Sequence, residues 1–131
     1  VFEGETSSEV SALRSRKSIG KEHTFNRDQK DIELVLQRLD TLIDRVFERM
    51  AEMGISARMA EVKIRYAGFE THTHHRSIPV AMDEKSVFRR LAHRLFAHNC
   101  DFDRPIRLVG FRVGHLEMPA TRQITLDTEE E

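Results

Sequence analysis

The sequence predicts an α+β domain of order β-α-β-β-α-β, in which a four-stranded antiparallel sheet has two helices packed on one face and an open opposite face. Three observations predict this fold. Segments 28–53 and 83–98 have apolar residues at helical spacing, and four other segments have the alternation or composition of strands. Both helices also need an apolar surface to cover, and one face of a single sheet would serve both.

The first strand is expected at 14–25 and the first helix at 28–53. The apolar stripe of this helix comprises Ile32, Val35, Leu36, Leu39, Leu42, Ile43, Val46 and Met50. Asn26 or Asp28 is expected to cap its start, because a short polar side chain can accept a hydrogen bond from the first free amides. Gly54 follows the helix at the position where a left-handed C-cap is common.

The next two strands are expected to form a hairpin. Residues 59–67 alternate between two faces, with Ala60, Val62, Ile64 and Tyr66 on one and Glu61, Lys63, Arg65 and Ala67 on the other. Gly68 permits a tight reversal into residues 70–78, a Thr- and His-rich segment expected to pair with the preceding strand. Pro79 is expected to end this strand, because proline has no amide to donate.

The second helix is expected at 83–98, beginning at Asp83. Its apolar stripe comprises Val87, Leu91 and Leu95, with Phe88 and Phe96 beside it. Asn99 can stop the helix, and the last strand is expected at 105–114. Residues 1–13 and 117–131 are expected to be tails on either side of a folded domain at 14–116.

Composition predicts a single soluble domain in a reducing compartment. The chain has 131 residues, of which 39% are hydrophobic and 33% charged. It contains no run of 18 apolar residues and no signal peptide, so we expect a cytoplasmic monomer without a membrane span. Its single cysteine, Cys100, excludes an internal disulfide framework and is expected to be idle. A start without Met suggests a fragment or a processed product.

Charge is segregated along the chain. The net charge is −1, but the two ends hold seven acids and no base, which leaves 21 bases against 15 acids in the body. The strand segments 14–25, 58–78 and 104–116 hold eleven bases and three acids, whereas 28–53 holds four bases and seven acids. We therefore expect a basic open sheet face that lies against a phosphate backbone. An ordinary charged sheet surface is the alternative.

The sequence shows no catalytic centre and calls for no cofactor of its own. A nucleophile triad, a P-loop and a dinucleotide fingerprint are all missing. Asp101 and Asp103 form the nearest carboxylate pair, but they are expected to cap the helix end and start the next strand. His72 and His74 share one strand face and could ligate a metal together, yet no third ligand at a suitable spacing supports them. Phosphate hydrogen bonds are the preferred role for this His- and Thr-rich run.

Three stretches resemble the signatures of one family. They are RKSIGKEHTF at 16–25, EVKIRYAGFETHTHHRSIP at 61–79 and RPIRLVGFRVGHL at 104–116. These stretches resemble, in the same order, the little-finger domain of Y-family DNA polymerases. The resemblance implies the fold predicted above, and it implies a domain that lies along the major groove of primer–template DNA in an error-prone translesion enzyme. The catalytic carboxylates and their Mg²⁺ would then belong to a palm domain outside this sequence.

The same resemblance implies a set of DNA-binding residues. They are Arg16, Lys17, Ser18, Gly20, Lys21, Thr24, Lys63, Arg65, Thr73, His75, Arg76, Arg107 and Arg112. Gly20 would allow a phosphate to reach the backbone amides, which explains a glycine inside a strand. His74 and His75 stand where relatives carry Arg or Ser, so this contact would be pH-sensitive. Which sheet face each residue occupies is left open, because a bulge would shift the alternation.

The C-terminal segment resembles a second family feature. Members commonly end in a short peptide that docks into the sliding clamp, and QITLD at 123–127 has the corresponding pattern. Gln123 would be the polar anchor, and Ile124 and Leu126 would fill apolar pockets. Two other functions stay open on the residues alone. One is a small α+β module that binds a ligand or a protein on its open sheet face, and the other is an independent metalloenzyme built on the histidines at 72–75.

Overall fold

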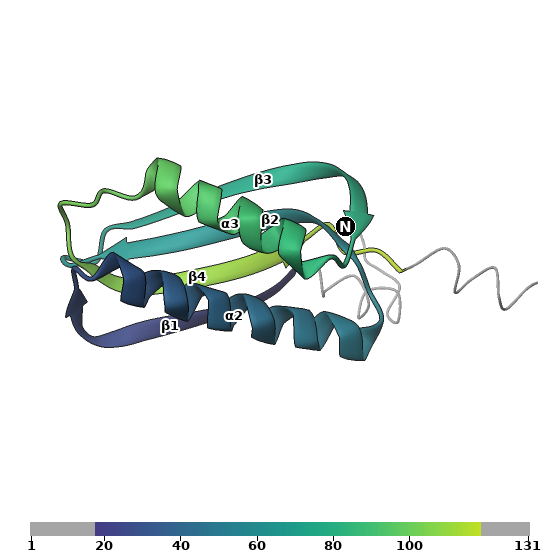
Figure 1. Ribbon diagram of the computed structural model, residues 1–131, viewed down its shortest axis with the longest axis horizontal. Helices are drawn as coiled ribbons and strands as arrows, with labels where there is room; N and C mark the ends of the chain where they lie inside the picture. The colour runs from purple at the N-terminus through teal and green to yellow at the C-terminus, as the bar shows by residue number, and fades with distance from the viewer. Residues whose placement is uncertain (1–17, 119–131) are drawn as a thin grey trace, which may run out of the picture.

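The computed structural model describes residues 18–118, which form six elements in the predicted order (Figure 1). They are β1 Ser18–Gln29, α2 Ile32–Met53, β2 Ala57–Tyr66, β3 Thr71–Met82, α3 Lys85–Asn99 and β4 Ile106–Gly114. The strands form one antiparallel sheet in the order β1-β4-β2-β3, so β1 and β3 are its edges. The predicted fold class is confirmed.

The two helices lie side by side on one face of the sheet (Figure 1). Helix α2 packs against β1 and β4, and α3 packs against β2 and β3. The opposite face has no described element over it. Neither described helix is long and apolar enough to cross a membrane.

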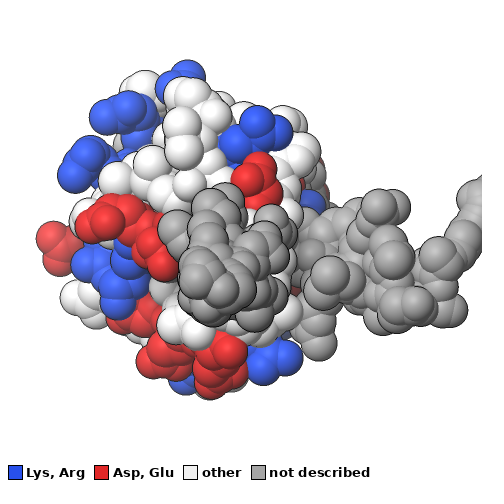
Figure 2. All heavy atoms as spheres, turned by 90° about the vertical axis from the view of Figure 1, so that its right-hand side faces the viewer, with Lys and Arg blue, Asp and Glu red and all other residues white. Residues whose placement is uncertain are grey.

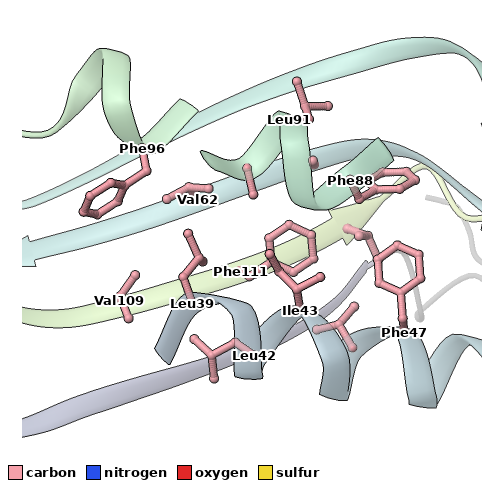
Figure 3. Packing of buried hydrophobic residues seen from close by; sticks show 14 of the residues in the cluster. Leu39, Leu42, Ile43, Phe47, Val62, Phe88, Leu91, Phe96, Val109 and Phe111 are labelled. Atoms are coloured by element: carbon pink, nitrogen blue, oxygen red, sulfur yellow. The ribbon is translucent and has the colours of Figure 1, made fainter. Parts of the chain in front are cut away.

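A single apolar core fills the space between the helices and the sheet (Figure 3). Its largest fully buried side chains are Phe88, Phe96, Phe111, Leu39, Ile43, Met50, Ile64, Ile106, Val35, Val46, Val62 and Val109. Burying each such side chain contributes roughly 1.5–3 kcal/mol. The alternation expected for the second strand is confirmed, because Ala60, Val62, Ile64 and Tyr66 are all at most 2% exposed.

The C-cap of helix α2 is the predicted residue, but its N-cap is a different residue from those predicted. Gly54 has φ 66° and ψ 41°, the predicted left-handed C-cap. The N-cap is Asp31, whose Oδ1 accepts a hydrogen bond from the Leu34 amide at 3.3 Å. The predicted N-caps Asn26 and Asp28 are wrong, because β1 continues to Gln29 and the helix starts later than expected.

The two edge strands continue further toward the C-terminus than predicted because of irregular pairing. Against β4, the register of β1 shifts between Thr24 and Gln29, and this absorbs residues that were assigned to the helix start. The predicted stop at Pro79 is wrong, because β3 runs on to Met82 through a second register shift. An edge strand tolerates proline, since an amide on its outer side has no ladder partner to lose.

The remaining boundaries differ from the prediction by one or two residues. Helix α3 begins at Lys85 after Glu84, whose side chain makes no capping bond, and the helix includes Asn99. The β2–β3 turn has positive φ at Gly68 (94°) and Phe69 (71°), which confirms the predicted reversal. The Asp101 side chain accepts from the Asp103 amide at 3.1 Å, so it closes a turn after α3.

Candidate nucleic-acid interface

Strand register places the outward-facing residues of the open sheet face in four rows. Since Ile64 and Tyr66 point into the core, their neighbours Lys63 and Arg65 point outward. In the order β1, β4, β2, β3, the rows are Ser18–Gly114–Met59–Ser77, Gly20–Arg112–Glu61–His75, Glu22–Gly110–Lys63–Thr73 and Thr24–Leu108–Arg65–Thr71. We call this surface the open face. It combines hydroxyl, guanidinium, ammonium and imidazole donors on four adjacent strands.

Two carboxylates neutralise much of the positive charge on the open face. Both Glu61 oxygens accept hydrogen bonds from Arg112 Nη2, at 2.7 and 2.8 Å. Lys63 Nζ lies 2.6 Å from Glu22 Oε2, two strands away, and the intervening residue in that row is Gly110. The sequence predicted a strongly basic face. The four described strands do hold eight bases and three acids, but the bases of the open face are largely paired.

Arg65 is the exception among the open-face bases. Its Nε donates to the Thr71 hydroxyl at 2.8 Å, and no carboxylate in residues 18–118 pairs with it. The hydroxyl orients the guanidinium and leaves its charge uncompensated. Arg65 is therefore the base of this face that is best prepared to bind an anion.

A hollow of about 300 Å³ opens at the centre of the open face. It is lined by Gly20, Lys21, Glu22, Glu61, Lys63, Thr73, Gly110, Phe111 and Arg112. Two of these residues are glycines on neighbouring strands, so the sheet backbone is close to the surface there. The hollow can admit a small anionic group beside Lys63 and Arg112, provided that these bases exchange their carboxylate partners.

Gly20 has a packing role that the sequence did not reveal. A Cβ at this position would lie 3.1 Å from Arg112 Cβ, 3.2 Å from Arg112 Cγ and 3.3 Å from the Phe111 carbonyl oxygen. The stem of Arg112 therefore lies over Gly20. This close approach explains the glycine whether or not a phosphate also reaches the strand.

The structure brings together eight of the predicted DNA-binding residues and separates others from them. The open face holds Ser18, Gly20, Thr24, Lys63, Arg65, Thr73, His75 and Arg112. Lys21 and Arg76 project to the helix side of the two edge strands, where they are exposed because no further strand or helix covers them. Arg107 lies at the irregular end of β4 and pairs with Asp28 at 3.2 Å. The predicted positions Arg16, Lys17, Gln123, Ile124 and Leu126 lie outside the described residues.

The histidine run is divided between the two sides of the sheet. His72 and His74 stack on the helix side with ring centroids 6.4 Å apart, whereas His75 is on the open face. The hydrogen bond from His72 lowers the pKa of Glu70, with a further contribution from Arg104. Within residues 18–118 no group of three or more His, Cys, Asp or Glu side chains is placed to hold a metal ion. The structure gives the metalloenzyme hypothesis no support.

The helical layer shows a charge segregation of its own. Helix α3 contains four bases and no acid, whereas α2 contains five acids and three bases. Seen from the right-hand end of Figure 1, Lys and Arg gather toward the top of the molecule and Asp and Glu toward the lower left (Figure 2). Asp44 pairs with Lys85 and Arg89 at 3.0 Å, and Asp40 lies 2.6 Å from His93 Nε2. These contacts join the two helices away from the open face.

Cys100 and His23, which lie away from the open face, have shifted pKa values. Burial raises the pKa of the Cys100 thiol, so the thiol is protonated at neutral pH and fits the predicted idle role. Burial also lowers the pKa of His23, and repulsion from Arg38 and Arg45 on α2 lowers it further.

Sequence reasoning missed Glu22 and Gly110 as members of the open face, and it assigned no partner to Glu61. Alternation along each strand does place Glu61 outward, and Glu22 lies in the signature stretch beside Gly20 and Lys21. Their pairing with Lys63 and Arg112 depends on the register of three strands. A single sequence does not specify that register.

Comparison with known proteins agrees with this architecture. Residues 16–126 match the model of the impB/mucB/samB family C-terminal domain. DNA polymerase IV of Staphylococcus haemolyticus is 35% identical over 119 residues, which are 91% of this chain and 33% of that protein. DNA polymerase IV of Methanoculleus marisnigri gives the same identity and coverage. The chain thus spans about a third of the length of these curated relatives.

Solved structures share the fold at low sequence identity. One described as "Dbh Ternary Complex" has a TM-score of 0.67 at 12% identity over 78% of this chain and 30% of that chain. Another, "Complex of beta-clamp processivity factor and little finger domain of PolIV", has a TM-score of 0.59 at 20% identity over 78% of this chain and 91% of that chain.

The fold and the site define an α+β domain with two helices on one sheet face and hydrogen-bond donors on the other. The chain belongs to the impB/mucB/samB family, as its C-terminal domain. The predicted resemblance to the little-finger domain of Y-family DNA polymerases is confirmed, and the curated relatives that show it are DNA polymerase IV proteins.

Proposed function

We propose that this domain binds primer–template duplex DNA through its open face, without sequence preference. The observation that supports this most directly is the set of three bases, Arg112, Lys63 and Arg65, on adjacent strands that no described helix covers. A sheet face without covering helices can lie along a duplex groove while its bases meet the phosphates on either side. Contacts to phosphate position a protein but read no bases.

The remaining predicted residues extend this surface. Ser18, Thr24, Thr73 and His75 supply hydroxyl and imidazole donors from the two edge strands. Lys21 and Arg76 project from the same edge strands on their helix side, and there they would meet phosphates that pass beyond the sheet margin. Arg16, Lys17 and Arg107 are proposed to add further phosphate contacts.

The relatives support a role for the parent protein as well. They are named DNA polymerase IV, so we infer that the parent is an error-prone, DNA-directed DNA polymerase of the cytoplasm. Nucleotide transfer with Mg²⁺ would occur in a palm domain supplied by the other two-thirds of such a protein. This chain would contribute DNA binding and no catalytic residue.

The C-terminal segment is proposed to tether the parent to a sliding clamp. A structural relative is described as a complex of the beta clamp with a little-finger domain, which supports the proposal for the family fold. Gln123, Ile124 and Leu126 would bind as an extended peptide beyond the folded domain, and the domain itself would act as a monomer. Residues 14–116 would then be the DNA-binding unit, and 117–131 the tether.

Anisotropy titrations with two duplexes of unrelated sequence test the DNA proposal. Affinity is expected to fall steeply between roughly 50 and 200 mM salt, because binding releases condensed counterions. Arg65→Ala should weaken binding to both duplexes equally and reduce the salt slope by about one. Arg49→Ala on α2 is the control, since it removes the same charge from the helix side. Salt-independent binding, or a loss confined to one sequence, would contradict the proposal and favour a protein- or ligand-binding module.

A truncation pair tests the tether. Removing residues 122–131 should abolish binding of the chain to its sliding clamp in surface plasmon resonance. Removing only residues 128–131 takes away three acids and keeps QITLD, so clamp binding should persist. Equal clamp affinity for the full chain and the longer truncation would exclude this peptide as the tether.

A further inference from the structure

The open face contains two acids whose positions are unexpected for a surface that meets phosphate. Glu22 and Glu61 lie in the two central rows, on opposite sides of β4. Each binds a base that would otherwise be available, with Lys63 at 2.6 Å from Glu22 and Arg112 at 2.7 Å from Glu61. The carboxylates therefore lie at the rim of the central hollow, where an anionic ligand would approach.

We infer that Glu22 and Glu61 act as internal competitors of DNA phosphate, which set how tightly the open face binds. The inference rests on the proposed DNA-binding function. A carboxylate offers guanidinium and ammonium groups the same kind of charged oxygen pair that a phosphate does. DNA must compete with these partners for Lys63 and Arg112, so each acid lowers affinity by occupying a base and by repelling the phosphate.

Exposure shows that the exchange is physically open. The Arg112 side chain is 48% exposed although its partner Glu61 is only 12% exposed, so a phosphate can reach the guanidinium from solvent. In the other pair it is the acid, Glu22, that is more exposed, at 49% against 29% for Lys63. Lys63 can turn from Glu22 toward the hollow over Gly110, which has no side chain to obstruct it.

Structural support is a weaker explanation for these pairs. The three strands that they connect are already held by continuous backbone pairing and by the core on the other side of the sheet. The Lys63–Glu22 pair contributes little to folding, because its acid is half exposed and water and salt screen the pair. In the Arg112–Glu61 pair only the guanidinium is exposed, so screening weakens that pair less. The pairs would affect an anionic ligand far more, since that ligand must replace one partner of each pair.

The test compares the DNA affinity of the full chain with that of E22Q and E61Q. Glutamine keeps the shape and one acceptor, so Lys63 and Arg112 stay oriented while the competing charge is removed. Each variant should bind duplex about threefold to tenfold more tightly at about 100 mM salt. Its salt slope should also be steeper by up to about one, because a displaced carboxylate in the wild type takes up a cation and glutamine does not.

Two further variants separate this mechanism from a general effect of charge. E52Q removes the same charge from α2, where Glu52 pairs with Arg49 at 3.1 Å. Its effect should stay within about twofold, since screening limits distant charges at this salt. In a K63M background, E22Q should lose most of its gain, because the base that it releases is missing.

Each outcome has a defined meaning. If the wild type binds with the expected salt dependence but E22Q and E61Q bind equally or more weakly, the competitor role is wrong and the acids position the bases. The proposed function would survive that result. If neither the wild type nor any variant binds duplex, both proposals fail. Thermal unfolding checks that the variants are folded, and E22Q alone decides the outcome if E61Q is not, because Glu22 is the more exposed acid.

Discussion

The two faces of the sheet are built from alternate residues of the same strands, yet they follow different rules. On the helix side, paired positions of the two central strands, β4 and β2, are apolar and almost fully buried, as in Val113–Ala60, Phe111–Val62 and Val109–Ile64. On the open face, neighbouring positions are glycine, hydroxyl or oppositely charged groups held by direct pairs. Burial determines the first face, whereas the second is free to be selected for what it binds.

Removing a large core side chain should produce the greatest loss of stability. Phe88 on α3 is 0% exposed, and its ring centroid lies 5.2 Å from that of Phe47 on α2 (Figure 3). Phe88→Ala is expected to lower the free energy of unfolding by about 3–5 kcal/mol, through lost burial and the cavity left behind. Urea titration measures the loss. Arg65→Ala on the open face should stay within about 0.5 kcal/mol, and an equal loss would refute the distinction between the faces.

Leu108 tests whether the open face is free of buried apolar packing, which is what distinguishes it from the helix-side face. It is only 3% exposed but lies on the open face, between Thr24 and Arg65 in its row, and it is not part of the helix-side cluster. Leu108→Ala is expected to cost about 2 kcal/mol in urea unfolding, the low end for a buried leucine, because flexible side chains around it can close the gap. A loss as large as that of Phe88→Ala would mean that the open face has a core of its own.

The helix-side face could be predicted from the sequence in outline, but the predicted stripe of α3 is partly wrong, because Val87 and Leu95 are only half-buried. The buried residues of this helix are Phe88, Leu91, Ala92 and Phe96. Periodicity identified the stripe of α2, and alternation identified the four inward residues of β2, because burial leaves a local signal. The missed boundaries have a shared physical cause. Both β1 and β3 continue through register shifts that no local sequence pattern predicts. Pro79 lies in the shifted part of β3, an edge strand that tolerates proline.

For the open face, the sequence predicted which basic residues are present but not the acids with which they pair. Lys63, Arg65 and Arg112 were identified as basic, but their partners could not be identified from the sequence. Glu22 is 41 residues from Lys63, and Glu61 is 51 residues from Arg112. These pairs exist because β4 lies between β1 and β2, and long-range strand order is what a single sequence specifies least.

Two of the open-face glycines, Gly20 and Gly110, allow a matched test of local packing. Gly20→Ala would place a methyl 3.1 Å from Arg112 Cβ and 3.3 Å from a backbone oxygen, so the strand or Arg112 must shift. We expect a loss of about 1 kcal/mol by urea unfolding. Gly110→Ala meets nothing closer than 3.4 Å and should be neutral or stabilise by up to about 1 kcal/mol. Equal effects at both positions would show that the contact with Arg112 is not what requires Gly20.

The smallest expected effect concerns Glu70, which lies at the end of the sheet and belongs neither to the buried helix-side face nor to the open face. Its carboxylate binds His72 Nε2 at 2.6 Å and Arg104 Nη1 at 3.0 Å, and these contacts lower its pKa from the ordinary 4.5. A lowered pKa in the folded state stabilises the protein above about pH 4.5, and this stabilisation is lost as the pH falls through the folded value. The melting temperature of the wild type should therefore exceed that of Glu70→Gln slightly at neutral pH, and the difference should vanish in acid. A difference that does not shrink in acid would mean that the side chain stabilises the turn by packing and not by charge.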